Sequence, residues 1–334
     1  MKISGLIAIF LFVVSFGFLS SCQKKTPQIG ILIHNYDNER WLKDRDHLVE
    51  NLKSKGAVAM VEVANNDQKR QIEQAREMIK KGAQVLIVVP IDQDEAARIV
   101  ELAHESNVKV IAYDRLINGC KLDYYITANS TRIGELQASY LTSLHPVGTY
   151  ALIGGARTDN NSLRLFLGQM NVFQPLMEKG DVQLVYSEFG DAWTKEDGYR
   201  QAKIIIDKYA DDLTGIICGN DNQALGALDA LKESGLEGKV MLAGQDAELA
   251  NLKEIMKGNQ TCTILKPLKE TAQAATDLAI ALALDKPLDM QFTTESNGKA
   301  LVKSILIDAT VVNRNNMEST VVASGFHTDA EINQ

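Results

Sequence analysis

The chain has 334 residues, of which 45% are hydrophobic and 23% are charged, and its formal net charge is −8 at pH 7. A single hydrophobic core stops growing near ~250–300 residues, so this length predicts two domains. The acidic balance argues against nucleic acid as a partner, because phosphate binding needs a basic surface.

Residues 1–21 have the layout of a bacterial export signal. Lys2 supplies a positive charge, and Leu6–Phe18 is an apolar stretch that is too short to predict a membrane span. The following Leu19-Ser20-Ser21-Cys22 resembles a bacterial lipobox, whose cysteine becomes the lipidated N-terminus. The alternative is an ordinary secretory signal with an incidental cysteine. We expect a signal peptide over 1–21, a lipid on Cys22 and a tether over 22–27. The mature protein is then in the periplasm or at the cell surface, held to a membrane by its lipid alone.

Apolar runs alternate with amphipathic stretches from residue 28 to residue 128. A short apolar run predicts a buried strand, and apolar residues at helical spacing predict an amphipathic helix. Strands that alternate with helices predict a parallel, doubly wound sheet. The predicted strands are Ile29–His34, Val58–Ala64, Val85–Val89, Val108–Tyr113 and Tyr124–Ala128, and the predicted helices are Arg40–Lys55, Gln68–Lys81 and Asp94–Ser106.

The same rhythm restarts after the predicted helix Thr131–Leu144, which indicates a second α/β lobe of the same construction. Its strands are predicted at Tyr150–Ile153, Gln183–Ser187, Gly215–Cys218, Val240–Ala243 and Thr261–Leu265, and its helices at Ser162–Glu178, Lys195–Tyr209, Gln223–Ser234 and Glu248–Lys257. A last helix, Leu268–Leu284, precedes extended segments around Ala300–Ile307 and Val321–Phe326. The pattern alone does not assign these segments to a lobe.

Asp114 and Arg115 directly follow the buried strand Val108–Tyr113. In open α/β sheets, ligands bind in the crevice beyond the carboxyl ends of the strands. A carboxylate beside a guanidinium offers hydrogen-bond acceptors and a fork of donors, which suits a neutral polyol. The alternative is a salt bridge between the two residues that only closes the loop.

Two lobes that face each other across a hinge form a cleft, and the polar loops at the strand ends line it. These loops are rich in Asn, Asp and Arg and contain the two tryptophans of the chain. Aromatic faces cover the C–H face of a sugar ring, and planar polar groups hold vicinal hydroxyls. Structural alternatives exist for several of these residues. They are helix capping for Asn220 and Asp246, core packing for Trp41 and solvation for Lys266.

Three cysteines remain beyond Cys22, namely Cys120, Cys218 and Cys262, and no C-x-x-C motif is present. An odd number cannot pair internally, and the apolar runs around Cys218 and Cys262 predict buried free thiols. The histidines are scattered without pairs at i, i+4, so neither a metal site nor another cofactor is expected.

Several stretches together resemble the sugar-binding proteins of the periplasmic binding protein type I class. The resemblance covers about residue 28 to about residue 327. The stretches are Glu39-Arg40-Trp41-Leu42-Lys43-Asp44-Arg45-Asp46, Ala112-Tyr113-Asp114-Arg115, Gly134-Glu135-Leu136-Gln137-Ala138, Asp159-Asn160-Asn161, Gly219-Asn220-Asp221, Gly244-Gln245-Asp246-Ala247 and Lys266-Pro267.

The resemblance implies a sugar site in the cleft between the lobes. It implies that Trp41 and Trp193 sandwich a pyranose ring. It places Arg40, Asp114 and Arg115 as hydroxyl ligands from the first lobe, and Asn161, Asn220, Asp246 and Lys266 as those from the second. The segment His34-Asn35-Tyr36-Asp37 and Cys218 depart from the family pattern.

The resemblance also implies three crossovers between the lobes, near Ala128–Ser130, near Leu265–Pro267 and within Thr294–Lys303. The N-terminal lobe is then expected over 28–129 plus about 267–298. The C-terminal lobe is expected over 130–266 plus about 299–334.

The function implied by the family is delivery of a monosaccharide to an ABC-type sugar permease, by a monomer that closes around its ligand. The Asn220-Asp221 form of its loop favours D-xylose, with a multi-sugar protein for glucose and galactose as the alternative. A sensory role beside a membrane kinase or chemoreceptor has the same ligand chemistry. A glycosidase would need two carboxylates such as Asp114 and Asp246, but each has a cation or amide neighbour, so no enzyme is predicted. A transcriptional repressor of the related class would carry a DNA-binding helix-turn-helix domain at its N-terminus. The predicted export signal occupies that position, so a repressor is not predicted.

Overall fold

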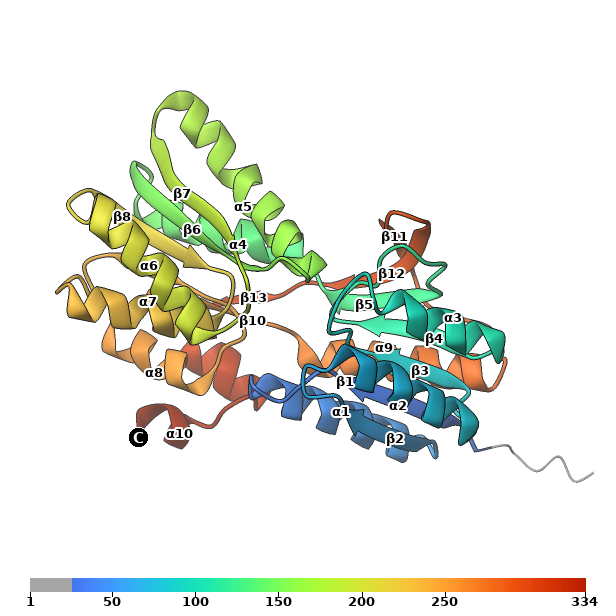
Figure 1. Ribbon diagram of the computed structural model, residues 1–334. Coiled ribbons are helices and arrows are strands. Elements are labelled where there is room, and N and C mark those ends of the chain that lie inside the picture. Colours follow the sequence, from blue (N-terminus) through green and yellow to red (C-terminus); the bar gives the residue numbers. More distant parts are fainter. Residues whose placement is uncertain (1–25) are drawn as a thin grey trace, which may run out of the picture.

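The computed structural model describes residues 26–334, which form two α/β lobes joined by three connections (Figure 1). This arrangement confirms the predicted fold class of two doubly wound lobes. The predicted signal peptide and Cys22 lie outside the described residues.

The first lobe is built on a seven-stranded sheet in the order β11-β12-β5-β4-β3-β1-β2. Every neighbouring pair is parallel except β11 with β12. Its elements from the first half of the chain are β1 (Gln28–Ile33), α1 (Arg40–Ser54), β2 (Val58–Val63), α2 (Gln68–Lys80), β3 (Val85–Val88), α3 (Ala97–Glu105), β4 (Lys109–Tyr113) and β5 (Tyr124–Ala128).

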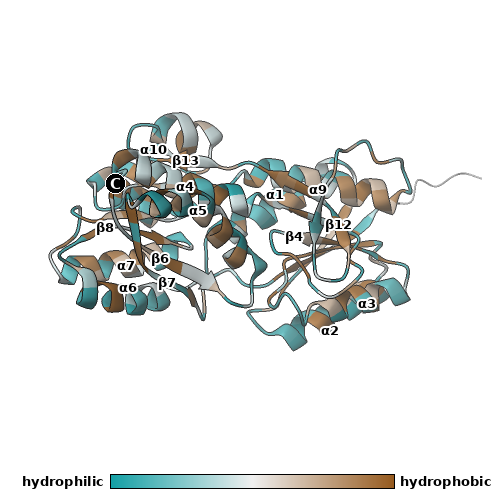
Figure 2. Ribbon diagram, turned by 90° about the horizontal axis from the view of Figure 1, so that it is seen from above, coloured by the Kyte–Doolittle hydropathy of each residue, from teal (hydrophilic) through white to brown (hydrophobic). Residues whose placement is uncertain are grey.

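Both faces of this sheet are covered, which explains why its central strands are apolar throughout. On one face, Leu86 and Val110 pack against α2 and α3. On the other face, Ile31 and Ile87 pack against α1 and the later helix α9 (Leu268–Ala283), so the chain returns to the first lobe after the second. Figure 2 shows hydrophobic strands inside helices whose outer faces are hydrophilic.

The second lobe has a parallel four-stranded sheet in the order β7-β6-β8-β9. The antiparallel pair β10–β13 lies beside it, joined by a bridge between Ala243 and Cys262. Its elements are α4 (Ser130–Leu144), β6 (Gly148–Ala156), α5 (Asn160–Lys179), β7 (Val182–Gly190), α6 (Lys195–Tyr209), β8 (Leu213–Cys218), α7 (Asp221–Glu233), β9 (Met241–Ala243), α8 (Leu249–Lys257) and β10 (Thr263–Leu265).

The C-terminal part corrects the expected third crossover. β11 (Thr293–Ser296) and β12 (Leu301–Ile307) belong to the first-lobe sheet, where β12 pairs with β5 in parallel. Residues 299–307 are therefore in the first lobe, and the expectation that placed them in the second is wrong. Val302 and Ser304 point into the first-lobe core, which holds this strand there. The chain crosses only after Ile307, before β13 (Thr310–Val312).

The prediction of an extended segment around Val321–Phe326 is also wrong. Glu318–Val322 forms a single π-helical turn, and α10 (Asp329–Asn333) follows it. Met317 and Val321 are four residues apart and pack together into a cluster around α8. On a helix, residues four apart lie one above the other on the same face, so both side chains reach this cluster.

The three described cysteines are buried and free, as predicted for Cys218 and Cys262. Burial raises the pKa of the Cys120 thiol to about 11, so the thiol is protonated at neutral pH. Within residues 26–334, no cluster of His, Cys, Asp or Glu could hold a metal ion. None of the helices described is both long and apolar enough to cross a membrane.

Candidate functional site

A cavity of about 460 Å³ lies between the lobes, at the carboxyl ends of the strands. Its volume falls in the range of small-molecule sites. Eight of the nine predicted ligand residues line it, and Asn161 lies behind this wall. The eight are Arg40, Trp41, Asp114, Arg115, Trp193, Asn220, Asp246 and Lys266.

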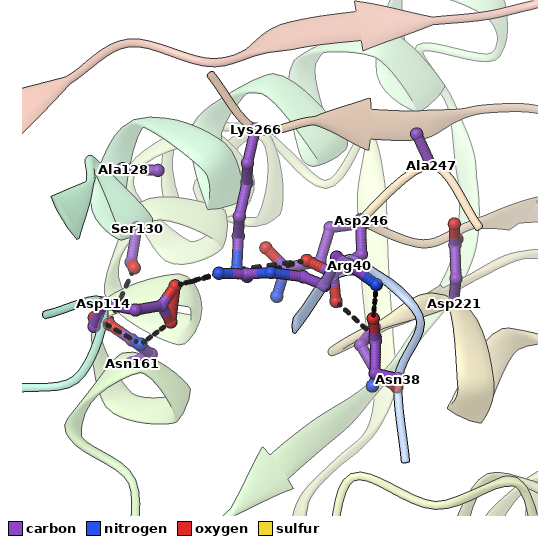
Figure 3. Close-up of polar contacts among 12 residues, drawn as sticks. Asn38, Arg40, Asp114, Ala128, Ser130, Asn161, Asp221, Asp246, Ala247 and Lys266 are labelled. Atoms are coloured by element: carbon purple, nitrogen blue, oxygen red, sulfur yellow. Dashed lines mark hydrogen bonds and ion pairs between the residues drawn. The ribbon is translucent and has the colours of Figure 1, made fainter. Parts of the chain in front are cut away.

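Arg40 lies at the centre of the site and joins the two lobes (Figure 3). It begins α1 and is only 3% exposed. Its Nη2 is 2.6 Å from Asp114 Oδ2 in the first lobe, and its Nη1 is 3.3 Å from Asp246 Oδ1 in the second. On the far side, Asp44 Oδ2 accepts from Arg40 Nε and Nη2 at 3.2 and 3.0 Å. One rigid guanidinium therefore fixes three buried carboxylates.

Lys266 supplies the second positive charge of the site. Its Nζ lies 3.1 Å from Asp246 Oδ1 and 3.8 Å from Asp114 Oδ2. Burial alone would raise the pKa of the Asp114 carboxyl, but Arg40 and then Lys266 outweigh it and hold this pKa below its ordinary value. Asp114 is therefore ionised, and positive and negative charges almost balance within the site.

Asp114 and Asp246 occupy equivalent positions in the two lobes. Each follows a strand, and each donates its backbone N–H to an isoleucine carbonyl at 2.8 Å, Ile126 for Asp114 and Ile264 for Asp246. Both have a positive φ, 65° and 102°. Such a backbone costs ~1–3 kcal/mol in a residue other than glycine and is found where surrounding contacts impose it. The backbone is therefore strained at the two residues whose carboxylates both pair with Arg40.

Arg115 and Asn161 connect the lobes on the other side of Asp114. Arg115 Nε lies 2.9 Å from Asp159 Oδ2 in the second lobe, so Arg115 and Asp114 each find a partner elsewhere rather than closing a loop together. Asn161 Nδ2 donates to the backbone oxygen of Asp114 at 3.0 Å, and its Oδ1 accepts from Ser130 at 2.9 Å. Asn161 thus supports the Asp114 backbone from behind.

The two tryptophans have different surroundings. Trp41 is 5% exposed and packs in the first-lobe core, with the Arg40 guanidinium 4.0 Å from its ring centroid. Trp41 therefore packs in the core, as the structural alternative proposed, and also forms part of the cavity wall. Trp193 is half-buried and packs against Gly155, where an added Cβ would be 2.0 Å from the indole. Only glycine fits beneath this ring.

Helix capping is correct for Asn220 and wrong for Asp246. Asn220 Oδ1 accepts from the backbone of Gln223 at 2.9 Å, which caps α7, and its Nδ2 donates to the Trp193 carbonyl at 3.2 Å. The N-cap of α8 is Glu248. Asp246 instead directs its oxygens at Arg40, Lys266 and Asn38.

Sequence reasoning missed side chains in the β1–α1 loop. Asn38 donates to Asp246 Oδ2 across the cleft at 3.2 Å and accepts from the Arg40 backbone at 3.0 Å. His34 lies in the cavity wall, 2% exposed. The signal was present, since His34–Glu39 is a polar run after a buried strand, but a run of polar residues does not indicate which ones point inward.

Several buried polar atoms around the cavity have no hydrogen-bond partner. They are His34 Nδ1, Trp193 Nε1 and Gln245 Oε1. Most buried polar groups in proteins are paired, so unpaired ones around a cavity indicate a polar ligand. Donors, acceptors, balanced charges and two indoles together suit an uncharged molecule with many hydroxyls.

Comparisons with known proteins agree with this chemistry. A model of the periplasmic binding protein domain matches residues 29–287. The chain is 36% identical over 315 residues to the D-xylose-binding periplasmic protein of Haemophilus influenzae, covering 94% of this chain and 95% of that protein. It is 36% identical over 308 residues to the protein of the same description from Escherichia coli K12, covering 92% and 93%. A solved carbohydrate transporter solute-binding protein from Chloroflexus aurantiacus, in complex with D-glucose, superposes with a TM-score of 0.84 at 28% identity, covering 92% of this chain and 98% of that one.

Proposed function

The chain belongs to the periplasmic binding protein domain family, and from this we propose that its cleft binds a monosaccharide, D-xylose first, for delivery to an ABC-type sugar permease. The observation that carries the proposal is the Arg40 guanidinium between Asp114 and Asp246. It brings fixed donors and acceptors from both lobes to one cavity whose charges nearly balance. A neutral polyol matches such a site, whereas a charged ligand would leave one charge unpaired.

Closure of the lobes is the proposed mechanism. Several polar contacts cross the cleft, among them the ion pairs Arg40–Asp246, Lys266–Asp114 and Arg115–Asp159. A sugar that bonds to groups of both lobes favours the closed form by its higher affinity for that form. The closed protein then docks on the permease as a monomer. A partnership with a membrane kinase or chemoreceptor would use the same closure, and the neighbouring genes distinguish the two roles.

D-Xylose is proposed over hexoses on two grounds. The relatives at 36% identity are described as D-xylose-binding proteins. In the proposed sandwich, Trp193, which packs on Gly155, would limit the room beside C5, where a hexose carries its hydroxymethyl group. The runner-up is a multi-sugar protein that also accepts glucose, which is supported by the similar fold of the glucose complex from Chloroflexus aurantiacus.

A binding role is also favoured over catalysis. A glycosidase needs a general acid that carries its proton near neutral pH. Arg40 and Lys266 overcome the effect of burial and keep the pKa of Asp114 low, so this carboxyl does not retain a proton there. We expect no turnover of aryl glycosides.

Anchoring through a lipid on Cys22 is proposed from the lipobox alone. Cells that express the chain with a radiolabelled fatty acid should label the wild type and leave Cys22→Ser unlabelled. Equal labelling of both would contradict the lipoprotein.

Titration of tryptophan fluorescence with D-xylose, D-glucose, D-galactose, D-ribose and L-arabinose tests the proposed ligand. D-Xylose should bind most tightly, and a sugar with one misplaced hydroxyl should bind at least about tenfold more weakly, because an unmade buried hydrogen bond costs ~1–3 kcal/mol. If no sugar binds more tightly than millimolar, the assignment fails.

Trp193→Ala, followed by calorimetry, should abolish binding with little change in folding, and a wild-type affinity would exclude the sandwich.

A further inference from the structure

His34 stands at the carboxyl end of β1, in the segment that departs from the family pattern. Its backbone oxygen accepts from Asn66 at 2.9 Å, which fixes the loop. Its ring lies edge-on to the Trp41 indole, with centroids 4.5 Å apart and planes at 83°. The imidazole is therefore held in the cavity wall beside the aromatic surface proposed to cover the sugar.

The polar atoms of this ring are unusually placed. The side chain is 2% exposed and its Nδ1 is buried without a hydrogen-bond partner. A buried donor or acceptor without a partner is destabilising, so such an atom is rare unless a ligand or water completes it. The cavity that His34 lines has polar as well as apolar walls, and a sugar hydroxyl is a group of matching chemistry.

Burial and the neighbouring cations keep the His34 ring neutral. Burial, and then the positive charge of Arg115, hold the pKa of the imidazole well below its ordinary value, with Arg40 acting in the same direction and Asp114 opposing. A neutral imidazole offers one donor and one acceptor, as a hydroxyl does. An acidic side chain at the same place would offer acceptors alone.

We propose that His34 is a specificity-determining residue, whose ring hydrogen-bonds one hydroxyl of the bound sugar beside Trp41. The inference rests on the proposed function and adds a ligand from the β1–α1 loop to those expected. With His34 as a ligand, the site discriminates between sugars at one hydroxyl position more strongly than the other contacts alone would.

The test is a cycle between His34 variants and sugars that each lack one hydroxyl. His34→Phe keeps the ring and its packing on Trp41 but removes both nitrogens. It should bind D-xylose about tenfold more weakly than the wild type. One deoxy analogue, among 1,5-anhydroxylitol and 2-, 3- and 4-deoxy-D-xylose, should bind the wild type about tenfold more weakly than D-xylose but lose nothing further in His34→Phe. His34→Gln, which retains a donor and an acceptor, should recover part of the loss.

Two controls make the outcome decisive. His145→Phe alters an exposed histidine at the end of α4 and should leave every affinity unchanged. Thermal unfolding should show that His34→Phe folds as the wild type does. If His34→Phe binds all five ligands as the wild type does, His34 only packs on Trp41 and the inference is wrong. If the wild type itself binds no sugar, the proposed function has failed, which is a different result.

Discussion

The two halves of the cleft use the same backbone device in different electrostatic surroundings. Asp114 and Asp246 both follow a strand, both have a positive φ and both donate to an isoleucine carbonyl of the next strand. Asp114 has the Arg40 guanidinium at 2.6 Å, and behind it Tyr113 donates to Asp44 at 2.6 Å. The first half is therefore an ion-paired cluster in which Asp114 stays ionised, although burial raises the pKa of the Asp44 carboxyl behind it.

The second half has acids behind it instead. Glu248, two residues after Asp246, donates its backbone N–H to Asp221 at 2.9 Å. Burial, then the charges of Asp246, Glu39 and Asp221, raise the pKa of the Glu248 carboxyl to about 9. This half therefore holds a proton at neutral pH. The comparison indicates that backbone geometry places the two carboxylates, while the residues behind them decide how each half responds to pH.

Removal of Arg40 should have the largest effect, because it belongs to both halves. Arg40→Met takes the guanidinium from three buried carboxylates and leaves only Lys266 beside Asp114 and Asp246. Loss of one partner of a buried pair costs ~3–5 kcal/mol. We expect that loss in urea unfolding, and a loss of sugar affinity of more than about 100-fold in calorimetry. Arg40→Lys, with one point charge, should restore folding better than binding.

The matched control is Arg45→Met on the same helix, whose side chain is partly exposed and pairs with Asp46. A surface pair contributes ~0–1 kcal/mol, so both unfolding and affinity should be close to wild type. An Arg40→Met protein that binds sugar normally would exclude the central role of the guanidinium.

Neutralising the two acids separately should distinguish the halves. Asp114→Asn removes the shortest ion pair of the site and should weaken sugar binding by about 100-fold, in line with ~1.5–3 kcal/mol for a charged hydrogen bond. Asp246→Asn should cost only about tenfold, because the pair between Asp246 and Arg40, at 3.3 Å, is longer than the 2.6 Å pair of Asp114. Calorimetry at one pH measures both, and equal losses would contradict the asymmetry.

The elements of the fold were predictable from local periodicity, but their long-range partners were not. Lys195–Tyr209 and Tyr124–Ala128 were predicted to the residue, since a helix or a buried strand is encoded by its own apolar spacing. β12 was assigned to the wrong lobe, because its partner β5 lies more than 170 residues earlier in the chain. Periodicity predicts a strand without indicating the sheet that it joins.

The site shows the same limit. Strand ends predicted which residues gather at the cleft, because all parallel strands of a sheet end at one edge. They did not predict that Arg40 pairs with acids 4, 74 and 206 residues away. They also left open whether Asn220 faces a ligand or its own helix. Such choices depend on side-chain orientation, which no pattern in the chain specifies.

The pH dependence of stability should differ between the halves. The pKa of Glu248 is about 9 in the folded protein and 4.5 ordinarily, so the folded state binds the proton more tightly. Its contribution is fully present below about pH 4.5 and is lost as the pH rises towards 9, by at most about 1.4 kcal/mol per pH unit. The pKa of Asp114 is lowered, so its contribution is lost only in acid.

Urea unfolding at pH 5.5, 7 and 8.5 measures this difference. Glu248→Gln should flatten the decline of the wild type over this range. Asp114→Asn should be less stable by a nearly constant amount at all three values. A wild-type decline that Glu248→Gln leaves unchanged would place the responsible proton elsewhere.

The smallest effect should come from Asn220, where capping and ligand roles can be separated. Asn220→Ala loses the cap of α7, which costs ~0.5–2 kcal/mol, whereas Asn220→Ser retains a capping oxygen and should unfold nearly as the wild type does. Asp67→Ser provides the matched change at the exposed cap of α2 in the first lobe. If Asn220 also serves the sugar, Asn220→Ser should lose a few-fold of affinity while its stability stays constant, because serine cannot donate to the Trp193 carbonyl as the amide does. An unchanged affinity in Asn220→Ser would assign Asn220 to the helix alone, and the second half of the cleft would then hold its ligand through Asp246 and Lys266.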